Sequence, residues 1–168
     1  TSISMENRRL VSGLQWLPLL LPIGLAIYAL TGLVRIWGSR VSHPYDLEWM
    51  EGGMLTHAWR LMQGQPIYVA PSEEFIPFIY PPGYSWLLAT ISQWVPLEHA
   101  TGRWISLVGT TLAATAIVAF VVRHRASWMG GWVTGILAAS AFLLAYPASG
   151  AFYDLVRPDA LGLGLMAW

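Results

Sequence analysis

The chain has no cysteine and no lysine, and only 11% of its 168 residues are charged. Without cysteine, disulfides, thiolate catalysis and cysteine-ligated metals are excluded, and the redox compartment cannot be inferred. Arginine supplies every fixed positive charge. The formal net charge is zero, which argues against a nucleic-acid partner because such proteins carry a basic surface. A soluble domain carries roughly 25% charged residues, so this composition predicts an integral membrane protein.

The sequence also lacks a Walker loop, an HExxH motif, a GxSxG motif and a dinucleotide-binding fingerprint. It is instead 55% hydrophobic, with ten Trp and seven Tyr that suit the aromatic belts of a membrane interface. The chemistry of the protein therefore has to come from the few charged residues that lie between apolar segments.

The apolar segments predict an all-α integral membrane protein with three transmembrane helices and the start of a fourth. We expect a single transmembrane module over residues 1–168. Its predicted parts are a first span at about 13–36, an outer loop at about 38–101, a second span at about 103–122, a third span at about 128–147, a second outer loop at about 148–159 and the start of a fourth span at about 160–168. We also expect the chain to be the amino-terminal portion of a longer protein, because it ends inside an apolar segment.

The first outer loop is predicted to contain two juxtamembrane helices. Residues 47–62 have apolar side chains at helical spacing, with Asp46 as the expected N-cap and Gly64 as the expected end signal. We expect this amphipathic helix to lie along the membrane surface. Residues 83–95 are apolar but too few, at about 1.5 Å per residue, to cross a hydrocarbon core of ~30 Å. They are expected to form a second juxtamembrane helix, partly buried in protein.

The positions of arginine predict the orientation in the membrane. Arg8 and Arg9 precede the first span, and Arg123 and Arg125 lie in the turn between the second and third spans. If residues 83–95 do not cross, the positive-inside rule places these four residues and the N-terminus in the cytoplasm. Eight of the nine acidic residues then lie on the outer, extracytoplasmic side. We therefore expect the two acidic loops to meet on one side of the membrane.

Three segments carry a family resemblance through their order and spacing. They are DLEWMEGGMLTHAWRLMQG at 46–64, YPPGYSWLLA at 80–89 and YDLVRPDALGLGL at 153–165. They are similar to the acidic motif with its following helix, the Pro-Pro motif of a juxtamembrane helix and the Arg-then-Asp entry into the next span of GT-C glycosyltransferases. Arg103 similarly resembles the Arg at the head of that family's second span. The protein O-mannosyltransferase and aminoarabinose-transferase branches resemble the chain most.

This resemblance implies an enzyme that transfers a sugar from a polyprenyl-phosphate-linked donor to an acceptor on the outer face of the membrane. The reaction needs a carboxylate to accept the acceptor's proton and cations to stabilise the departing phosphate. The family usually has an adjacent Asp-Glu pair, whereas the acids are spread out here, so Asp46 and then Glu51 are the candidates for the base. The expected catalytic residues are Asp46, Glu51, Glu48 and Asp159, and the expected substrate- or phosphate-binding residues are Arg157, Arg103, His57 and Tyr80.

No cofactor is expected to be required, and no residue is predicted to be a metal ligand. An Mg or Mn ion at the acidic cluster is the alternative, since the carboxylates of Asp46, Glu48 and Asp159 suit such ions. The expected partners are membrane lipid, the polyprenyl-phosphate sugar donor and other membrane subunits.

Each candidate residue also has a structural interpretation. Asp46 suits a helix cap, and Arg157 suits an ion pair with Asp154 or Asp159. Arg103 suits a side chain that extends to the lipid head groups. The alternative function is a non-catalytic GT-C-like scaffold subunit of a larger complex, which burial of Asp46 and Glu51 in ion pairs would favour.

Overall fold

The computed structural model describes residues 17–168, and this part of the chain is all-helical, without a strand. The helices are α2 (Leu17–Val41), α3 (Met50–Met62), α4 (Gly83–Ile91), α5 (His99–His124), α6 (Trp128–Leu144) and α7 (Pro158–Met166). The predicted all-α class is therefore confirmed for these residues. Arg8, Arg9 and residues 13–16 of the predicted first span lie outside the described residues.

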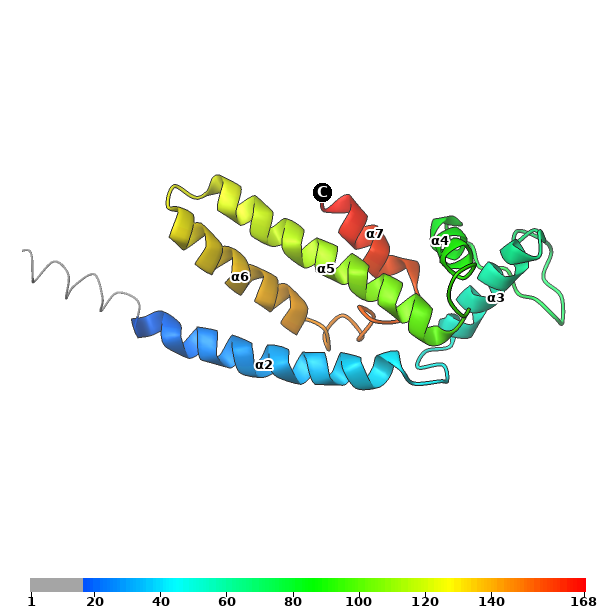
Figure 1. Ribbon diagram of the computed structural model, residues 1–168, viewed down its shortest axis with the longest axis horizontal. Helices are drawn as coiled ribbons and strands as arrows, with labels where there is room; N and C mark the ends of the chain where they lie inside the picture. The colour runs from blue at the N-terminus through cyan, green and yellow to red at the C-terminus, as the bar shows by residue number, and fades with distance from the viewer. Residues whose placement is uncertain (1–16) are drawn as a thin grey trace, which may run out of the picture.

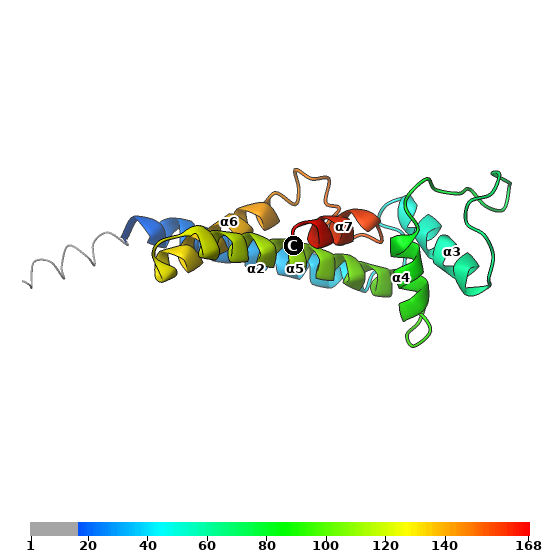
Figure 2. The same ribbon diagram turned by 90° about the horizontal axis from the view of Figure 1, so that it is seen from above.

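The helices form an elongated bundle with two short helices at one end. Helices α2, α5 and α6 run lengthwise, and α7 lies along α5 (Figure 1). Both views place α3 and α4 at the same end, with α4 across the long axis of the bundle (Figure 2). Helix α5 packs against both α6 and α7, while α2 packs mainly against α6. The candidate site residues lie where α3, α4 and the bundle join.

Two helices are long and apolar enough to cross a membrane, over Leu20–Val41 and His99–His124. The first exposes much of its apolar surface, with Leu21 71% and Tyr28 81% exposed. Exposed apolar area costs roughly 25 cal/mol per Å² in water, so a lipid environment suits this helix. Helix α6 has 17 residues and α7 has 9, so neither reaches the length of these two. The structure thus supports membrane association through two candidate spans.

Several predicted boundaries need correction. Helix α2 continues beyond residue 36 to Val41, because its last turn is held by contacts of Arg40 with Asp154 and Ala151 of the second loop. Helix α3 begins at Met50, with Trp49 and not Asp46 at the N-cap. Residues 42–49 are irregular, since the Leu47 N–H donates to the Glu51 side chain instead of entering a helix. Gly64 follows α3 as predicted, with a left-handed φ of 67°.

Helix α4 is shorter than predicted, because it ends at Ile91 and not at residue 95. Helix α6 likewise ends at Leu144 and not at residue 147. Pro147 has no backbone N–H and disfavours helical backbone at the residue before it, which explains this end. At about 1.5 Å per residue, α4 is far shorter than a hydrocarbon core of ~30 Å.

Glycine allows α7 to approach α5 closely. A Cβ on Gly109 would lie 2.5 Å from the Cα of Leu161, and one on Gly164 would lie 2.3 Å from the carbonyl oxygen of Gly109. Any larger side chain would collide with backbone at these positions. Small residues of this kind let helices associate in lipid. The crossing places the start of α7, and with it Arg157 and Asp159, beside the first half of α5.

A small apolar core joins α3 and α4 to the bundle. Its buried members are Met54 and Ala58 of α3, Tyr84, Leu88 and Ala89 of α4, Ile105 of α5 and Val156 of the second loop. The Tyr84 hydroxyl adds a hydrogen bond of 2.8 Å to the carbonyl of Gly102. This core holds the first loop against the second, which brings the charged residues of both together.

Candidate functional site

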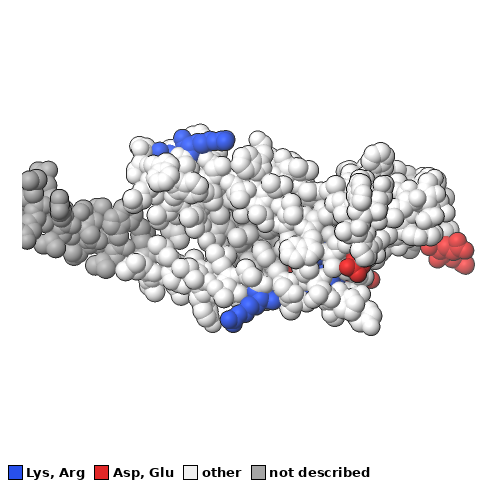
Figure 3. All heavy atoms as spheres, viewed as in Figure 1, with Lys and Arg blue, Asp and Glu red and all other residues white. Residues whose placement is uncertain are grey.

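The two charged loops contact each other at one end of the bundle. The Val156 N–H donates to Glu51 Oε1 at 2.9 Å, and Arg157 pairs with Glu48 at 3.4 Å. Arg40, in the last turn of α2, adds an ion pair with Asp154 of the second loop at 2.7 Å. On the face in Figure 3, acidic atoms gather at this end, and most of the remaining surface is uncharged. The two acidic loops therefore contact each other within the protein, whereas their place on the outer side of the membrane stays a prediction.

Glu51 and Arg103 form a buried ion pair at the centre of this contact. Both side chains are 0% exposed, and the guanidinium donates to the carboxylate through Nε at 2.9 Å and Nη2 at 2.7 Å. Glu51 also accepts the backbone N–H groups of Leu47 and Val156 at 2.7 and 2.9 Å. Each carboxylate oxygen thus accepts two hydrogen bonds, so Glu51 is fully engaged inside the protein.

Arg103 is engaged to the same extent. Its Nη1 donates to the carbonyls of Arg40 and His43 at 2.8 and 2.6 Å, and its Nη2 donates to the carbonyl of Tyr45 at 2.8 Å. Together with the two bonds to Glu51, these contacts use every N–H of the guanidinium. Arg103 therefore holds the irregular segment after α2 in place, and no donor is left for a phosphate.

The protonation state of Glu51 follows from these contacts. Burial acts to raise its pKa, but the hydrogen bonds from Arg103, Leu47 and Val156 and the positive charge of Arg103 outweigh it. The net result is a pKa below the ordinary value, so the carboxylate stays charged near neutral pH. A charged, saturated carboxylate is suited to holding structure together.

Arg157 is the second cation of the site. Its Nε donates to Asp159 at 2.9 Å, Nη1 lies 3.4 Å from Glu48, and Cζ lies 4.4 Å from the centroid of the Phe152 ring. Burial acts to lower its pKa, but Asp159, Glu48 and nearby Tyr80 outweigh it and raise the pKa, so Arg157 stays charged. Asp159 is about half exposed, and this cluster therefore reaches the surface.

His57 and Tyr80 differ in their surroundings. His57 is buried and stacks on Phe78. Its Nε2 accepts the Phe78 N–H at 2.9 Å and its Nδ1 donates to the Gly53 carbonyl at 2.6 Å, so both ring nitrogens serve the fold. Tyr80 is half-buried, and its hydroxyl contacts the sulfur of Met50 at 3.8 Å. Tyr80 lies close enough to Arg157 to affect its pKa.

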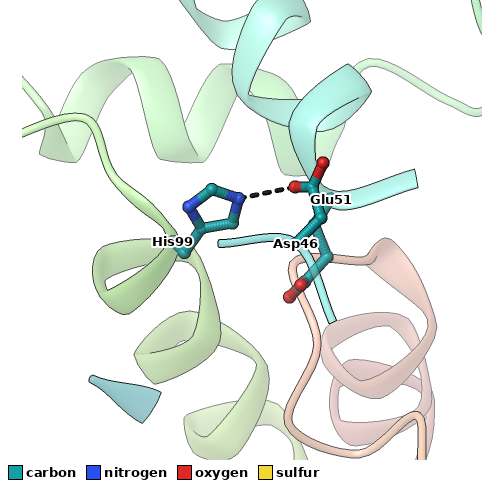
Figure 4. Close-up of side chains that lie close together, drawn as sticks. All are labelled: Asp46, Glu51 and His99. Carbon is teal, nitrogen blue, oxygen red and sulfur yellow. Dashed lines mark hydrogen bonds and ion pairs between the residues drawn. The ribbon is translucent and has the colours of Figure 1, made fainter. Parts of the chain in front are cut away.

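Asp46 lies in a different setting from Glu51. Its side chain is 48% exposed, and its Oδ1 lies 2.6 Å from Nε2 of His99, which is 18% exposed (Figure 4). His99 is the first residue of α5. Oδ2 has no hydrogen-bond partner among the described residues and lies beside Gly52, where a Cβ would come within 3.0 Å of it. Asp46 thus has one oxygen engaged by His99 and one that no described residue engages, on a side chain that is about half exposed.

The sequence did not predict the contact between His99 and Asp46. The two residues of this pair are far apart in the chain, and no spacing rule connects them.

Neither a protein-family model, nor a curated protein, nor a solved structure matches the chain. The function is therefore inferred from the residues themselves.

Three side chains of the site carry metal-ligand atoms that lie close together, but one of the three is already engaged. Asp46, Glu51 and His99 offer ligand atoms within 4.8 Å of one another. However, both oxygens of Glu51 already accept from Arg103 and backbone N–H groups, and the guanidinium would repel a cation. Of the acids considered from sequence, Glu48 and Asp159 both contact the cation Arg157.

An apolar groove of about 590 Å³ lies between α4 and α5, and none of the charged residues described above lines it. Its walls are apolar, with Leu87 and Ile91 from α4, Trp104 and Val108 from α5, and Leu161 from α7. Glu98 and Thr101 also line it. The groove is large enough and apolar enough for a hydrocarbon chain.

Proposed function

We propose that the protein is a membrane glycosyltransferase that transfers a sugar from a polyprenyl-phosphate-linked donor to a hydroxyl or amine acceptor. The observation that carries this proposal is the junction of the two loops, where the reachable carboxylate of Asp46 and the cation of Arg157 lie at one end of an apolar bundle. A carboxylate and a cation are the two groups that the reaction needs.

Asp46 is the general base of this proposal. The acceptor oxygen or nitrogen attacks the anomeric carbon with inversion, and its proton passes to Asp46. The bond between the anomeric carbon and the phosphate oxygen breaks, and its electron pair leaves with the lipid phosphate. Glu51 was the second candidate for the base, but its four hydrogen bonds leave no lone pair for a proton from the acceptor, so it acts as a structural residue.

Arg157 stabilises the departing phosphate in this proposal. Arg103 was the other candidate, but all its donors are engaged inside the protein. The planar guanidinium of Arg157 suits phosphate oxygens, and Asp159 and Glu48 orient it. Tyr80 lies close enough to Arg157 to contact the same group. The apolar groove between α4 and α5 receives the lipid chain of the donor.

The topology belongs to the same proposal. Helices α2, α5 and α6 cross the membrane, α7 begins a fourth crossing, and α3 and α4 lie at the surface of the outer face. The N-terminus and the α5–α6 turn then lie in the cytoplasm. Because the protein has no cysteine, single cysteines report the topology directly. An impermeant thiol reagent outside the cell should label cysteines at the exposed positions Glu73 and Ala148, but one at His124 only after permeabilisation. External labelling at only one of the first two positions contradicts this topology.

The direct test replaces Asp46 with Asn in the purified protein and measures sugar transfer from a polyprenyl-phosphate donor. Loss of a general base lowers the rate by about 10²- to 10⁴-fold. Glu73→Gln is the matched control, because Glu73 is an exposed acid of the same loop, and it should transfer at the wild-type rate. Transfer by Asp46→Asn at the wild-type rate would contradict the assignment.

The saturated Glu51–Arg103 pair favours a second candidate function, a non-catalytic scaffold subunit. Such a subunit needs rigid loops and no reachable base. Purification of the protein from native membranes distinguishes the two functions. A stable complex whose assembly is the same with wild-type protein and with Asp46→Asn, together with no sugar transfer by either, favours the scaffold.

A further inference from the structure

We infer that His99 is the positioning residue of Asp46 in the proposed transfer reaction, and this inference rests on the proposed function. The observation is the contact of 2.6 Å between Nε2 of His99 and Oδ1 of Asp46. If Nε2 carries the proton, it donates to Oδ1 and fixes the rotation of the carboxylate. Oδ2 then points to a defined place, where it accepts the proton of the acceptor.

The position of His99 is itself fixed by its place on α5. Arg103 lies one helical turn after His99, so both side chains project from the same face of the helix. Arg103 is bound to Glu51 and to the carbonyl of Tyr45, the residue immediately before Asp46. The first turns of α5 therefore hold residues 45–46 at two points. Arg103 binds the Tyr45 carbonyl in the buried part of the site, and His99 contacts Asp46 in its exposed part.

Gly52 completes the setting of the carboxylate. A Cβ at this residue would lie 3.0 Å from Oδ2 and 3.2 Å from Oδ1 of Asp46, so glycine leaves room for the side chain. The carboxylate of Asp46 thus contacts His99 through Oδ1 and packs against Gly52 at the start of α3. In the reaction His99 keeps its proton on Nε2 and the acceptor's proton goes to Oδ2, so His99 acts through Asp46 and does not exchange a proton itself.

The experiment compares His99→Leu with His99→Gln in the sugar-transfer assay. Leu removes the donor, and a misplaced catalytic group costs up to about 100-fold in rate, so kcat should fall by about 10- to 100-fold with an unchanged KM for the donor. Gln places an amide N–H close to the position of Nε2 and should retain kcat within a few-fold. His124→Leu, at the far end of α5, is the control for the loss of a histidine and should match wild type.

Each outcome decides the inference. Wild-type kcat in His99→Leu, or a raised KM with unchanged kcat, overturns it. If Asp46→Asn is inactive while His99→Leu is active, the inference fails and the proposed function stands. If the wild-type protein transfers no sugar, both fail.

A folding defect in His99→Leu does not end the test. In that event His99→Asn takes its place, because its amide is one methylene shorter than that of Gln and cannot reach Oδ1 in the same way. A loss of kcat in His99→Asn that His99→Gln restores supports the inference, and equal rates in the two variants overturn it.

Discussion

Two carboxylates of the same loop, Glu51 and Asp46, have opposite surroundings. Glu51 is 0% exposed and accepts four hydrogen bonds, two of them from a buried guanidinium. Asp46 has a half-exposed side chain and one hydrogen bond, to His99. A carboxylate that is saturated from within the protein holds the fold, whereas one with an open oxygen can react. The difference favours a structural role for Glu51 and leaves Asp46 as the proposed base, although both acids lie in one motif.

The largest expected effect is on stability, from Glu51→Ala. This change leaves Arg103 buried without its counter-ion, and breaking a buried pair costs about 3–5 kcal/mol. The measurement is the free energy of unfolding in detergent micelles. Glu74→Ala, at an exposed loop residue, is the control and should change it by less than about 0.5 kcal/mol. An effect of Glu51→Ala as small as that of the control would remove the structural role of Glu51.

A smaller effect on the free energy of unfolding is expected when the pH is lowered. The folded pKa of Glu51 lies below its ordinary value of 4.5, so the unfolded chain binds more protons than the folded protein in this range. The contribution of ionised Glu51 to stability is therefore complete above about pH 4.5 and is lost as the pH falls through the folded pKa. The difference in unfolding free energy between wild type and Glu51→Gln should be constant from neutral pH down to this value and should narrow below it. A difference that widens in acid would contradict the sign of the shift.

The smallest expected effect on stability comes from Asp46→Ala. The Asp46–His99 pair is partly exposed and screened by solvent, so its loss should cost less than about 1 kcal/mol. The same variant should lose sugar transfer. Measuring the unfolding free energy and the rate of sugar transfer on one preparation therefore separates the two acids, since Glu51→Ala should lose much more stability than Asp46→Ala. A stability loss in Asp46→Ala equal to that of Glu51→Ala would erase the contrast between them.

The sequence allowed much of the fold to be predicted. Apolar segments and their lengths predicted the helices α2, α5 and α6 in order, and helical spacing before Gly64 predicted α3. The boundaries were less accurate. The assignment of Asp46 as an N-cap was wrong, because capping statistics describe local backbone, whereas Asp46 is held by a side chain on a distant helix.

The candidate site was predictable in composition but not in pairing. The resemblance and the few available charges pointed to Asp46, Glu51, Arg103 and Arg157, and all four lie where the two loops meet. No pattern in the chain showed that Arg103 would bind Glu51 and not a phosphate. Likewise His57, a histidine within the acidic motif, is used within the fold, while His99, which belongs to none of the three motif segments, contacts Asp46.

The sequence by itself determined that the protein is helical and apolar, because the length and hydrophobicity of each segment are local properties. Only the tertiary structure decided which charged groups neutralise one another and which stay open to a ligand. The reason is that burial and hydrogen bonding depend on neighbours brought together from distant segments, as Gly109 and Gly164 bring α7 to α5. In the same way, one turn of α5 carries both Arg103, which binds the buried carboxylate of Glu51, and His99, which contacts the half-exposed carboxylate of Asp46.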